Sequence, residues 1–174
     1  MLDLYCYTGA FAVNAAKFGA KAVLGLDSSA PAIAVARENA ALNGVEELAT
    51  FEEDDAEIAL RSFAEGKQPF KADLILLDPP SLVPSKKHLA TALRAYGKLN
   101  SQALRALPKG GLLATSTCSH HVSREIFVEM LRLAAAKAQV PARLLALRGQ
   151  CCDHPVLLSM PETEYLHFAL LEVL

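Results

Sequence analysis

The sequence predicts an α/β fold with a mostly parallel, doubly wound sheet and helices on both of its faces. Short apolar runs alternate with longer stretches of helical periodicity along the chain, which is the pattern of consecutive β-α units. Polar or glycine-containing segments follow several apolar runs, as they do where parallel strands end at a binding crevice. Because no repeat, low-complexity segment or linker interrupts the alternation, we expect residues 1–174 to form one domain.

In the first part of the chain, each strand-like run is followed by a helical pattern. The clearest helix has Pro31 in its first turn and ends at the stop signal Asn43-Gly44. The expected strands there are Leu2–Tyr7, Ala22–Asp27 and Leu48–Glu52. The expected helices are Ala10–Phe18, Ala30–Asn43 and Ala56–Glu65.

The second part of the chain continues the alternation and ends in a strand. Ala72–Leu77 is a continuous apolar run, which is typical of a strand buried on both faces. The helix expected at Ser123–Ala138 begins with an N-cap serine and has an apolar side formed by Ile126, Phe127, Met130 and Leu131. The other expected elements are the helix Leu89–Leu107 and the strands Gly111–Thr115, Ala142–Leu147 and His167–Leu174.

The composition excludes several classes of protein. The chain is 52% hydrophobic and 21% charged, as globular domains are, and no apolar run is long enough to cross a bilayer. A net charge of −2 counts against tight nucleic-acid binding by this chain alone. Four cysteines are too few for a disulfide framework, so we expect free thiols and a cytoplasmic location. Because a strand begins directly at Met1, we expect the domain to be part of a longer protein.

Three strand ends predict a binding site for S-adenosylmethionine. The turn at the end of the first strand has a single glycine, Gly9, whereas dinucleotide sites use Gly-x-Gly-x-x-Gly to hold a pyrophosphate, so the ligand should lack phosphate. Asp27 ends the second strand, where an acid accepts hydrogen bonds from ribose hydroxyls. Asp55 follows the third strand and is placed to meet an adenine amino group. The alternative interpretation is that Asp27 and Asp55 only cap the helices after them.

Asp78-Pro79-Pro80 ends the fourth strand. The two prolines stop the strand and direct the Asp78 carboxylate into the crevice, although a rigid turn with a capping acid would have the same sequence. Many methyltransferases that act on amines place an aromatic residue after this motif. Here Ser81 and Leu82 follow, which counts against amine methylation.

Cys118 follows the fifth strand and is the candidate nucleophile. Carbon 5 of a pyrimidine is not nucleophilic until a thiolate adds at carbon 6, and an acid must then hydrogen-bond ring nitrogen 3. Cys118 and Asp78 are placed for these two roles. The alternative is that Cys118 is a small buried apolar residue.

Two further groups of residues have less specific patterns. Cys118, His120, Cys151, Cys152 and His154 include zinc-ligand types, but adjacent cysteines fit a tetrahedral site poorly, so we expect no metal. Basic or ring-bearing residues after the strand ends form either an RNA-binding rim or a solvated face. They are Lys86, Lys87, Arg94, Tyr96, His120 and His121.

Several motifs occur in the same order as in a known family. They are Asp3-Leu4-Tyr5-Cys6-Tyr7-Thr8-Gly9-Ala10-Phe11, Asp78-Pro79-Pro80, Tyr96-Gly97-Lys98-Leu99-Asn100, Thr117-Cys118-Ser119-His120-His121, Arg148-Gly149-Gln150 and Asp153-His154-Pro155-Val156. With them the chain resembles, over nearly its whole length, the RlmI-like 23S ribosomal RNA cytosine-5 methyltransferases. The resemblance implies a Rossmann-like methyltransferase sheet with an antiparallel last strand. Family members carry a PUA-type RNA-binding domain and a connecting domain before this one, and both are missing here.

The resemblance also implies roles for individual residues. Cys118 would be the nucleophile and Asp78 its acidic partner. The positions expected to line the S-adenosylmethionine site are Asp3, Tyr7, Thr8, Gly9, Phe11, Asp27, Ser28, Asp55, Ala56, Asp78 and Pro79.

We therefore expect methylation of cytosine carbon 5 in large-subunit ribosomal RNA. The expected partners are that RNA and, as an option that the sequence leaves open, a second copy in a homodimer; no membrane is expected. Two alternatives remain, namely a guanine-nitrogen RNA methyltransferase, which would not need Cys118, and a non-catalytic module that binds the cofactor or RNA.

Overall fold

The computed structural model describes residues 1–83 and 85–174, with every side chain in those ranges except that of Lys86. The strands are β1 (Leu2–Leu4), β2 (Val23–Asp27), β3 (Ala49–Glu53), β4 (Leu74–Leu77), β5 (Leu112–Thr117), β6 (Ala142–Arg148) and β7 (His167–Val173). The helices are α1 (Ala10–Lys17), α2 (Ala30–Leu42), α3 (Ala56–Ala64), α4 (Leu89–Ala106) and α5 (Arg124–Ala138). Two short 3₁₀ helices, η1 (Lys86–His88) and η2 (Pro161–Thr163), were not expected from the sequence.

The strands form one sheet in the order β3-β2-β1-β4-β5-β7-β6. Strands β1 to β5 pair in parallel, whereas β7 is antiparallel to both β5 and β6. This arrangement confirms the predicted Rossmann-like methyltransferase fold and its antiparallel last strand. The direction in which the chain adds strands reverses between β1 and β4, and open α/β sheets bind their ligands at such a switch point.

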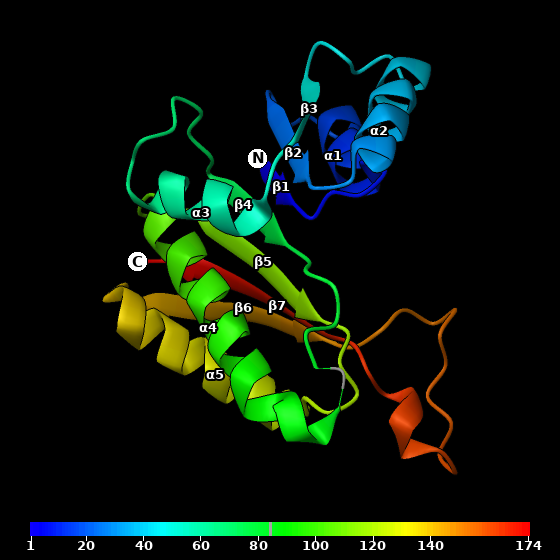
Figure 1. The fold of residues 1–174 in the computed structure, drawn as a ribbon, viewed down its shortest axis with the longest axis vertical. Helices are drawn as coiled ribbons and strands as arrows, with labels where there is room; N and C mark the ends of the chain where they lie inside the picture. Colours follow the sequence, from blue (N-terminus) through cyan, green and yellow to red (C-terminus); the bar gives the residue numbers. More distant parts are fainter. Residues whose placement is uncertain (84) are drawn as a thin grey trace.

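The sheet separates two apolar cores, which confirms that helices cover both faces. Side chains from β1, β4, β5 and β7 pack with α3, α4 and α5 in the larger core. Cys6, Val23 and Phe51 pack with α1 and α2 in the smaller one. Figure 1 shows α3, α4 and α5 as one layer over β4 to β7, with α1 and α2 grouped around β1 to β3.

Strand β1 is shorter than the sequence predicted. It ends at Leu4 rather than Tyr7, because Tyr5 (φ 63°) and Tyr7 (φ 48°) adopt left-handed backbone conformations. Such conformations are uncommon for residues other than glycine and tend to occur at functional sites. The other predicted strands and helices agree with the structure to within a few residues at their ends.

The segment between β6 and β7 leaves the body of the molecule. Figure 1 draws it in orange, extending from the end of the sheet at which β5 terminates. Residues 151–160 are all exposed. Over the described residues, no helix has the length and apolar character needed to span a membrane.

Candidate active site

The loops that bracket the switch point bring together most of the predicted site residues. The loop after β1 contains Tyr7 and Gly9, and Asp27 ends β2. Asp78 directly follows β4, and Cys118 directly follows β5. Because β1, β2, β4 and β5 are parallel, these residues lie at one edge of the sheet.

Asp27 connects two strand ends through backbone amides. Its Oδ2 accepts a hydrogen bond from the Tyr7 amide at 2.9 Å, and its Oδ1 accepts one from the Ser29 amide at 2.9 Å. Ser29, not Asp27, is the N-cap of α2, because its hydroxyl accepts from the Ala32 amide. A carboxylate offers about four acceptor positions, so Asp27 retains the capacity to bind ligand hydroxyls.

Asp3 is a buried acid in β1, the strand that leads into the loop with Tyr7 and Gly9. It is 1% exposed, and its Oδ2 has no hydrogen-bond partner in the structure. Burial raises the pKa of Asp3 to about 7; a backbone hydrogen bond from Ala12 opposes the shift, and the nearby charges of Asp78 and Asp27 reinforce it. The site therefore holds an acceptor that no group among the described residues satisfies.

The loop after β1 and the first turn of α1 also expose aromatic surface. Tyr7 is 67% exposed and Phe11 is 57% exposed. Gly9 has a φ of 78°, and a Cβ there would lie 2.7 Å from the Phe51 ring, so both the conformation and the packing require glycine. Thr8 is half-buried, and its carbonyl accepts a hydrogen bond from Asn39.

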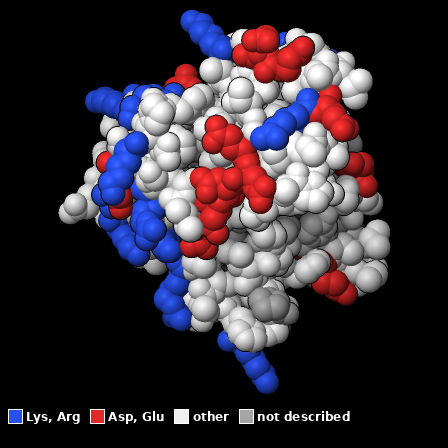
Figure 2. All heavy atoms as spheres, turned by 45° about the horizontal axis from the view of Figure 1, so that its top comes forward, with Lys and Arg blue, Asp and Glu red and all other residues white. Residues whose placement is uncertain are grey.

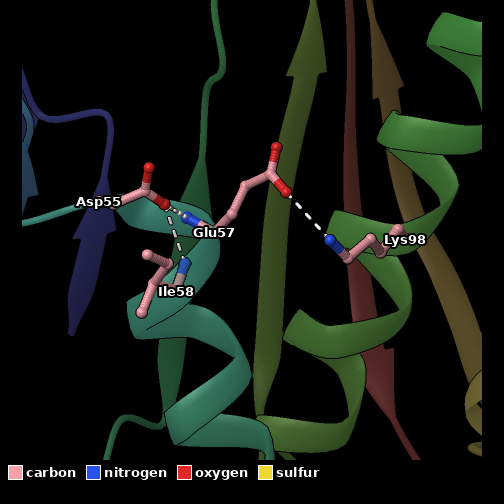
Figure 3. A network of polar contacts seen from close by, with 4 residues as sticks. All are labelled: Asp55, Glu57, Ile58 and Lys98. Atoms are coloured by element: carbon pink, nitrogen blue, oxygen red, sulfur yellow. Dashed lines mark hydrogen bonds and ion pairs between the residues drawn. The ribbon is translucent and has the colours of Figure 1, made fainter.

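Asp55 caps α3, as the alternative interpretation proposed. Its Oδ1 accepts hydrogen bonds from the amides of Glu57 and Ile58, both at 2.9 Å. In Figure 3 the second carboxylate oxygen of Asp55 points away from the helix, so capping uses only one side of the group. Glu57 also forms an ion pair with Lys98 at 3.1 Å, which joins α3 to α4.

Asp78 is joined to β5 by a residue that the sequence did not single out. The Ser116 hydroxyl donates a hydrogen bond to Asp78 Oδ1. Ser116 lies in β5 and Cys118 directly follows that strand, so both residues come from the same strand end. The signal available in the sequence was a hydroxyl residue two positions before the candidate nucleophile.

Cys118 is half-buried beside these groups. Burial and, after it, the negative charge of Asp78 raise the pKa of the Cys118 thiol, while backbone hydrogen bonds, one of them from Ser81, partly oppose this. The thiol is therefore mainly protonated at neutral pH. The loop after β4 and the loop after β5 thus meet at the Cys118 sulfur.

Tyr96 lies inside the protein rather than on a basic rim. It is 1% exposed, and its hydroxyl accepts a hydrogen bond from the Leu82 amide and donates to the Pro80 carbonyl. This pattern holds the loop after Asp78 against α4. Of the other residues predicted to form the rim, Lys87, Arg94 and His120 are exposed and His121 is half-buried. The Lys86 side chain lies outside the described part of the structure.

The remaining predicted site residues occupy the same strand ends. Ser28 is exposed, whereas Ala56 and Pro79 are buried. Within the part of the chain that the structure describes, no group of three or more His, Cys, Asp and Glu side chains could hold a metal ion. The expectation of a metal-free site stays a prediction.

Comparisons with known proteins bear on the family and the fold of the chain. The family model described as "Methyltransferase domain" matches residues 1–156. A ribosomal RNA large subunit methyltransferase I from Aeromonas hydrophila is 40% identical over 167 residues, which are 95% of this chain and 42% of that protein. The protein of the same name from Erwinia tasmaniensis is 38% identical over 167 residues, which are again 95% of this chain and 42% of that protein. The chain thus spans less than half the length of these relatives.

A solved structure gives a close match in fold. A putative methyltransferase complexed with SAH superimposes with a TM-score of 0.85 at 24% identity, over 99% of this chain and 44% of that one. At this identity the likeness establishes the fold alone.

Proposed function

The chain belongs to the methyltransferase domain family, and we propose that it methylates carbon 5 of a cytosine in large-subunit ribosomal RNA, with S-adenosylmethionine as the methyl donor and Cys118 as the nucleophile. The observation that carries this proposal is the meeting of Cys118 and the hydrogen-bonded Asp78–Ser116 pair at one edge of the sheet. The names of the relatives support the RNA substrate.

The residues after β1, β2 and β3 fit S-adenosylmethionine. The unpartnered oxygen of Asp3 suits its cationic amino group, and the spare acceptor positions of Asp27 suit ribose hydroxyls. The uncapped side of Asp55 and the exposed rings of Tyr7 and Phe11 suit adenine. When bound, this cofactor would supply an electrophilic methyl group.

Cys118 and Asp78 would activate the cytosine. The Cys118 thiol would give its proton to the Asp78 carboxylate, and the thiolate would add to carbon 6, which delocalises one electron pair over carbon 5 and nitrogen 3. Asp78, oriented by Ser116 and now carrying that proton, would donate a hydrogen bond to nitrogen 3. After carbon 5 has been methylated, nitrogen 3 leaves its proton with Asp78 and the proton on carbon 5 passes to solvent. The electrons of that carbon–hydrogen bond restore the ring double bond, which expels the Cys118 thiolate.

The distribution of charge supports binding of RNA at part of the surface. On the face drawn in Figure 2, acidic side chains gather at the centre, whereas Lys and Arg lie mostly along one edge. The exposed cations Lys87 and Arg94 lie on η1 and α4, which follow the Asp78 loop. We propose that they contact phosphates, which would make binding dependent on salt.

The direct test is a methyl-transfer assay on unmodified large-subunit ribosomal RNA, with nucleoside analysis of the product. We expect 5-methylcytosine from the wild-type chain and none from Cys118→Ala, whereas Cys151→Ala should resemble wild type because that thiol is exposed on the segment between β6 and β7 and has no part in the proposed chemistry. A methylated guanine, or product from Cys118→Ala, would favour a nitrogen methyltransferase instead.

A further inference from the structure

A hollow lies between the loop after β5 and the segment that connects β6 to β7. Its volume is about 380 Å³, within the range of small-ligand pockets, and it is lined by His120, Gln150, His154, Pro155, Glu162, Thr163 and Tyr165. His120 follows Cys118 by two residues, so one lining residue of the hollow comes from the same loop as the proposed nucleophile. The other lining residues come from the segment between β6 and β7, which the chemistry proposed above does not use.

Three rings form the wall of this hollow. The Tyr165 ring centroid lies 5.3 Å from that of His120 and 6.3 Å from that of His154. The Tyr165 hydroxyl is hydrogen-bonded to His154 Nδ1 at 2.9 Å. His120 Nδ1 lies 2.9 Å from the Glu162 carbonyl; since a carbonyl only accepts, Nδ1 carries the proton and Nε2 is an acceptor in the neutral ring.

Gln150 holds the segment in shape although residues 151–160 are exposed. Its Nε2 donates to the carbonyls of His154 at 3.0 Å and Thr163 at 2.6 Å, and its Oε1 accepts from the Tyr165 amide at 3.2 Å. One carboxamide thus fixes both ends of the segment. A loop that is organised by hydrogen bonds rather than by burial presents a pre-formed surface, which lowers the entropy cost of binding.

The chemistry of the wall selects one class of ligand. Among the described residues that line the hollow none is Lys or Arg, and Glu162 adds a carboxylate, so the hollow does not suit phosphate. Rings beside exposed acceptors suit an unstacked base, because single-stranded RNA is recognised by stacking bases on Tyr and His and by bonding their edges.

We propose that this hollow is a subsite for an unpaired nucleobase adjacent to the nucleotide that Cys118 attacks, with Tyr165 as its stacking platform. The inference rests on the proposed function for the identity of the neighbouring nucleotide. Binding of a base at the hollow would help to hold a single-stranded substrate while the target base enters the crevice.

The test uses equilibrium binding, which needs no methyl transfer. The probes are a single-stranded RNA nonamer of mixed sequence and a nonamer of the same length whose sugars carry no bases. Wild type should bind the base-bearing nonamer at least about fivefold more tightly, since stacking on one aromatic residue contributes about 1–3 kcal/mol per base. Tyr165→Ala should reduce this preference by about the same factor, and Tyr165→Phe should keep it because the ring remains.

Leu158→Ala is the matched control, because Leu158 belongs to the same segment, is 99% exposed and does not line the hollow. It should bind both nonamers as wild type does. An unchanged base preference in Tyr165→Ala, or no preference in wild type, would overturn the subsite. The methyl-transfer assay is read separately. Methylation without a base preference that depends on Tyr165 would support the proposed function and exclude the subsite. A base preference that depends on Tyr165, without methylation, would support the subsite and contradict the proposed function.

Discussion

The Ser116 hydroxyl donates a hydrogen bond to Oδ1 of Asp78, and this bond joins the ends of β4 and β5 at the candidate active site. Strands β4 and β5 are neighbours in the sheet, and their pairing ends at Leu77 and Thr115. The bond therefore continues the connection between the strands through side chains after the backbone pairing has ended. It also fixes the carboxylate whose charge raises the pKa of Cys118.

Ser116→Ala should uncouple these strand ends. Loss of a hydrogen bond to a carboxylate should lower the free energy of unfolding by about 1–3 kcal/mol. Methyl transfer should fall on the order of tenfold to a hundredfold because Asp78 loses its orientation. The control is Thr115→Val, since the Thr115 hydroxyl is buried without a partner. Chemical denaturation and methyl-transfer rates check both variants; equal rates in Ser116→Ala and wild type would remove the orienting role.

Gly9→Ala should destabilise the loop after β1. The residue has a left-handed φ of 78°, and the new methyl group would meet the Phe51 ring at 2.7 Å. Gly66→Ala is a matched control, because Gly66 has a φ of 69° and nothing lies near its added Cβ. We expect Gly9→Ala to lower the free energy of unfolding by roughly 1–3 kcal/mol more than Gly66→Ala does, because only the methyl group at position 9 overpacks its surroundings. Equal changes in thermal unfolding would contradict the packing argument.

The order of the elements was predictable from the sequence because β-α alternation and turn signals are local. The end of β1 was not, because tyrosine has no local preference for the left-handed conformation of Tyr5 and Tyr7. The burial of Tyr96 and the approach of Gln150 to Tyr165 also depend on contacts between distant segments. The sequence thus located the strand-end acids and Cys118, but could not predict how loops hold them.

Asp3→Asn should change how stability depends on pH. Burial raises the pKa of Asp3 to about 7 in the folded state, from an ordinary value near 4 in the unfolded chain. The unfolded state therefore loses this proton first, and stability falls as pH rises from about 4 to 7. Denaturation at several pH values should show that the free energy of unfolding depends less on pH in Asp3→Asn than in wild type. Above pH 7 the free energy of unfolding of the variant should be higher by as much as about 4 kcal/mol. Parallel profiles would mean that Asp3 ionises normally.

Asp27→Ala should weaken binding of S-adenosylmethionine by roughly 1–3 kcal/mol, because ligand hydroxyls and the Tyr7 amide would lose their acceptor. Calorimetric titration measures this change directly. Asp73→Ala is the control, since Asp73 precedes β4 at the opposite end of the strand and its side chain is 91% exposed. Unchanged affinity in Asp27→Ala would limit Asp27 to organising the loop.

RNA that carries 5-fluorocytosine should trap the chain through Cys118. Release of the methylated base requires removal of a proton from carbon 5, and fluorine leaves no such proton there. Protein and RNA should therefore remain joined when S-adenosylmethionine is present, and peptide mapping should place the bond at Cys118 rather than at Cys6, Cys151 or Cys152. Denaturing electrophoresis detects the joined species.

Only the thiolate adds to carbon 6, and burial and the charge of Asp78 raise the pKa of the Cys118 thiol, so trapping depends on transfer of the thiol proton to Asp78. Asp78→Asn should form more thiolate at a given pH, yet trap RNA more slowly because nitrogen 3 loses its acidic partner. Cys118→Ala should abolish trapping while leaving calorimetric binding of S-adenosylmethionine near normal, since the thiol acts on the base. A covalent species that persists in Cys118→Ala would exclude Cys118 as the nucleophile.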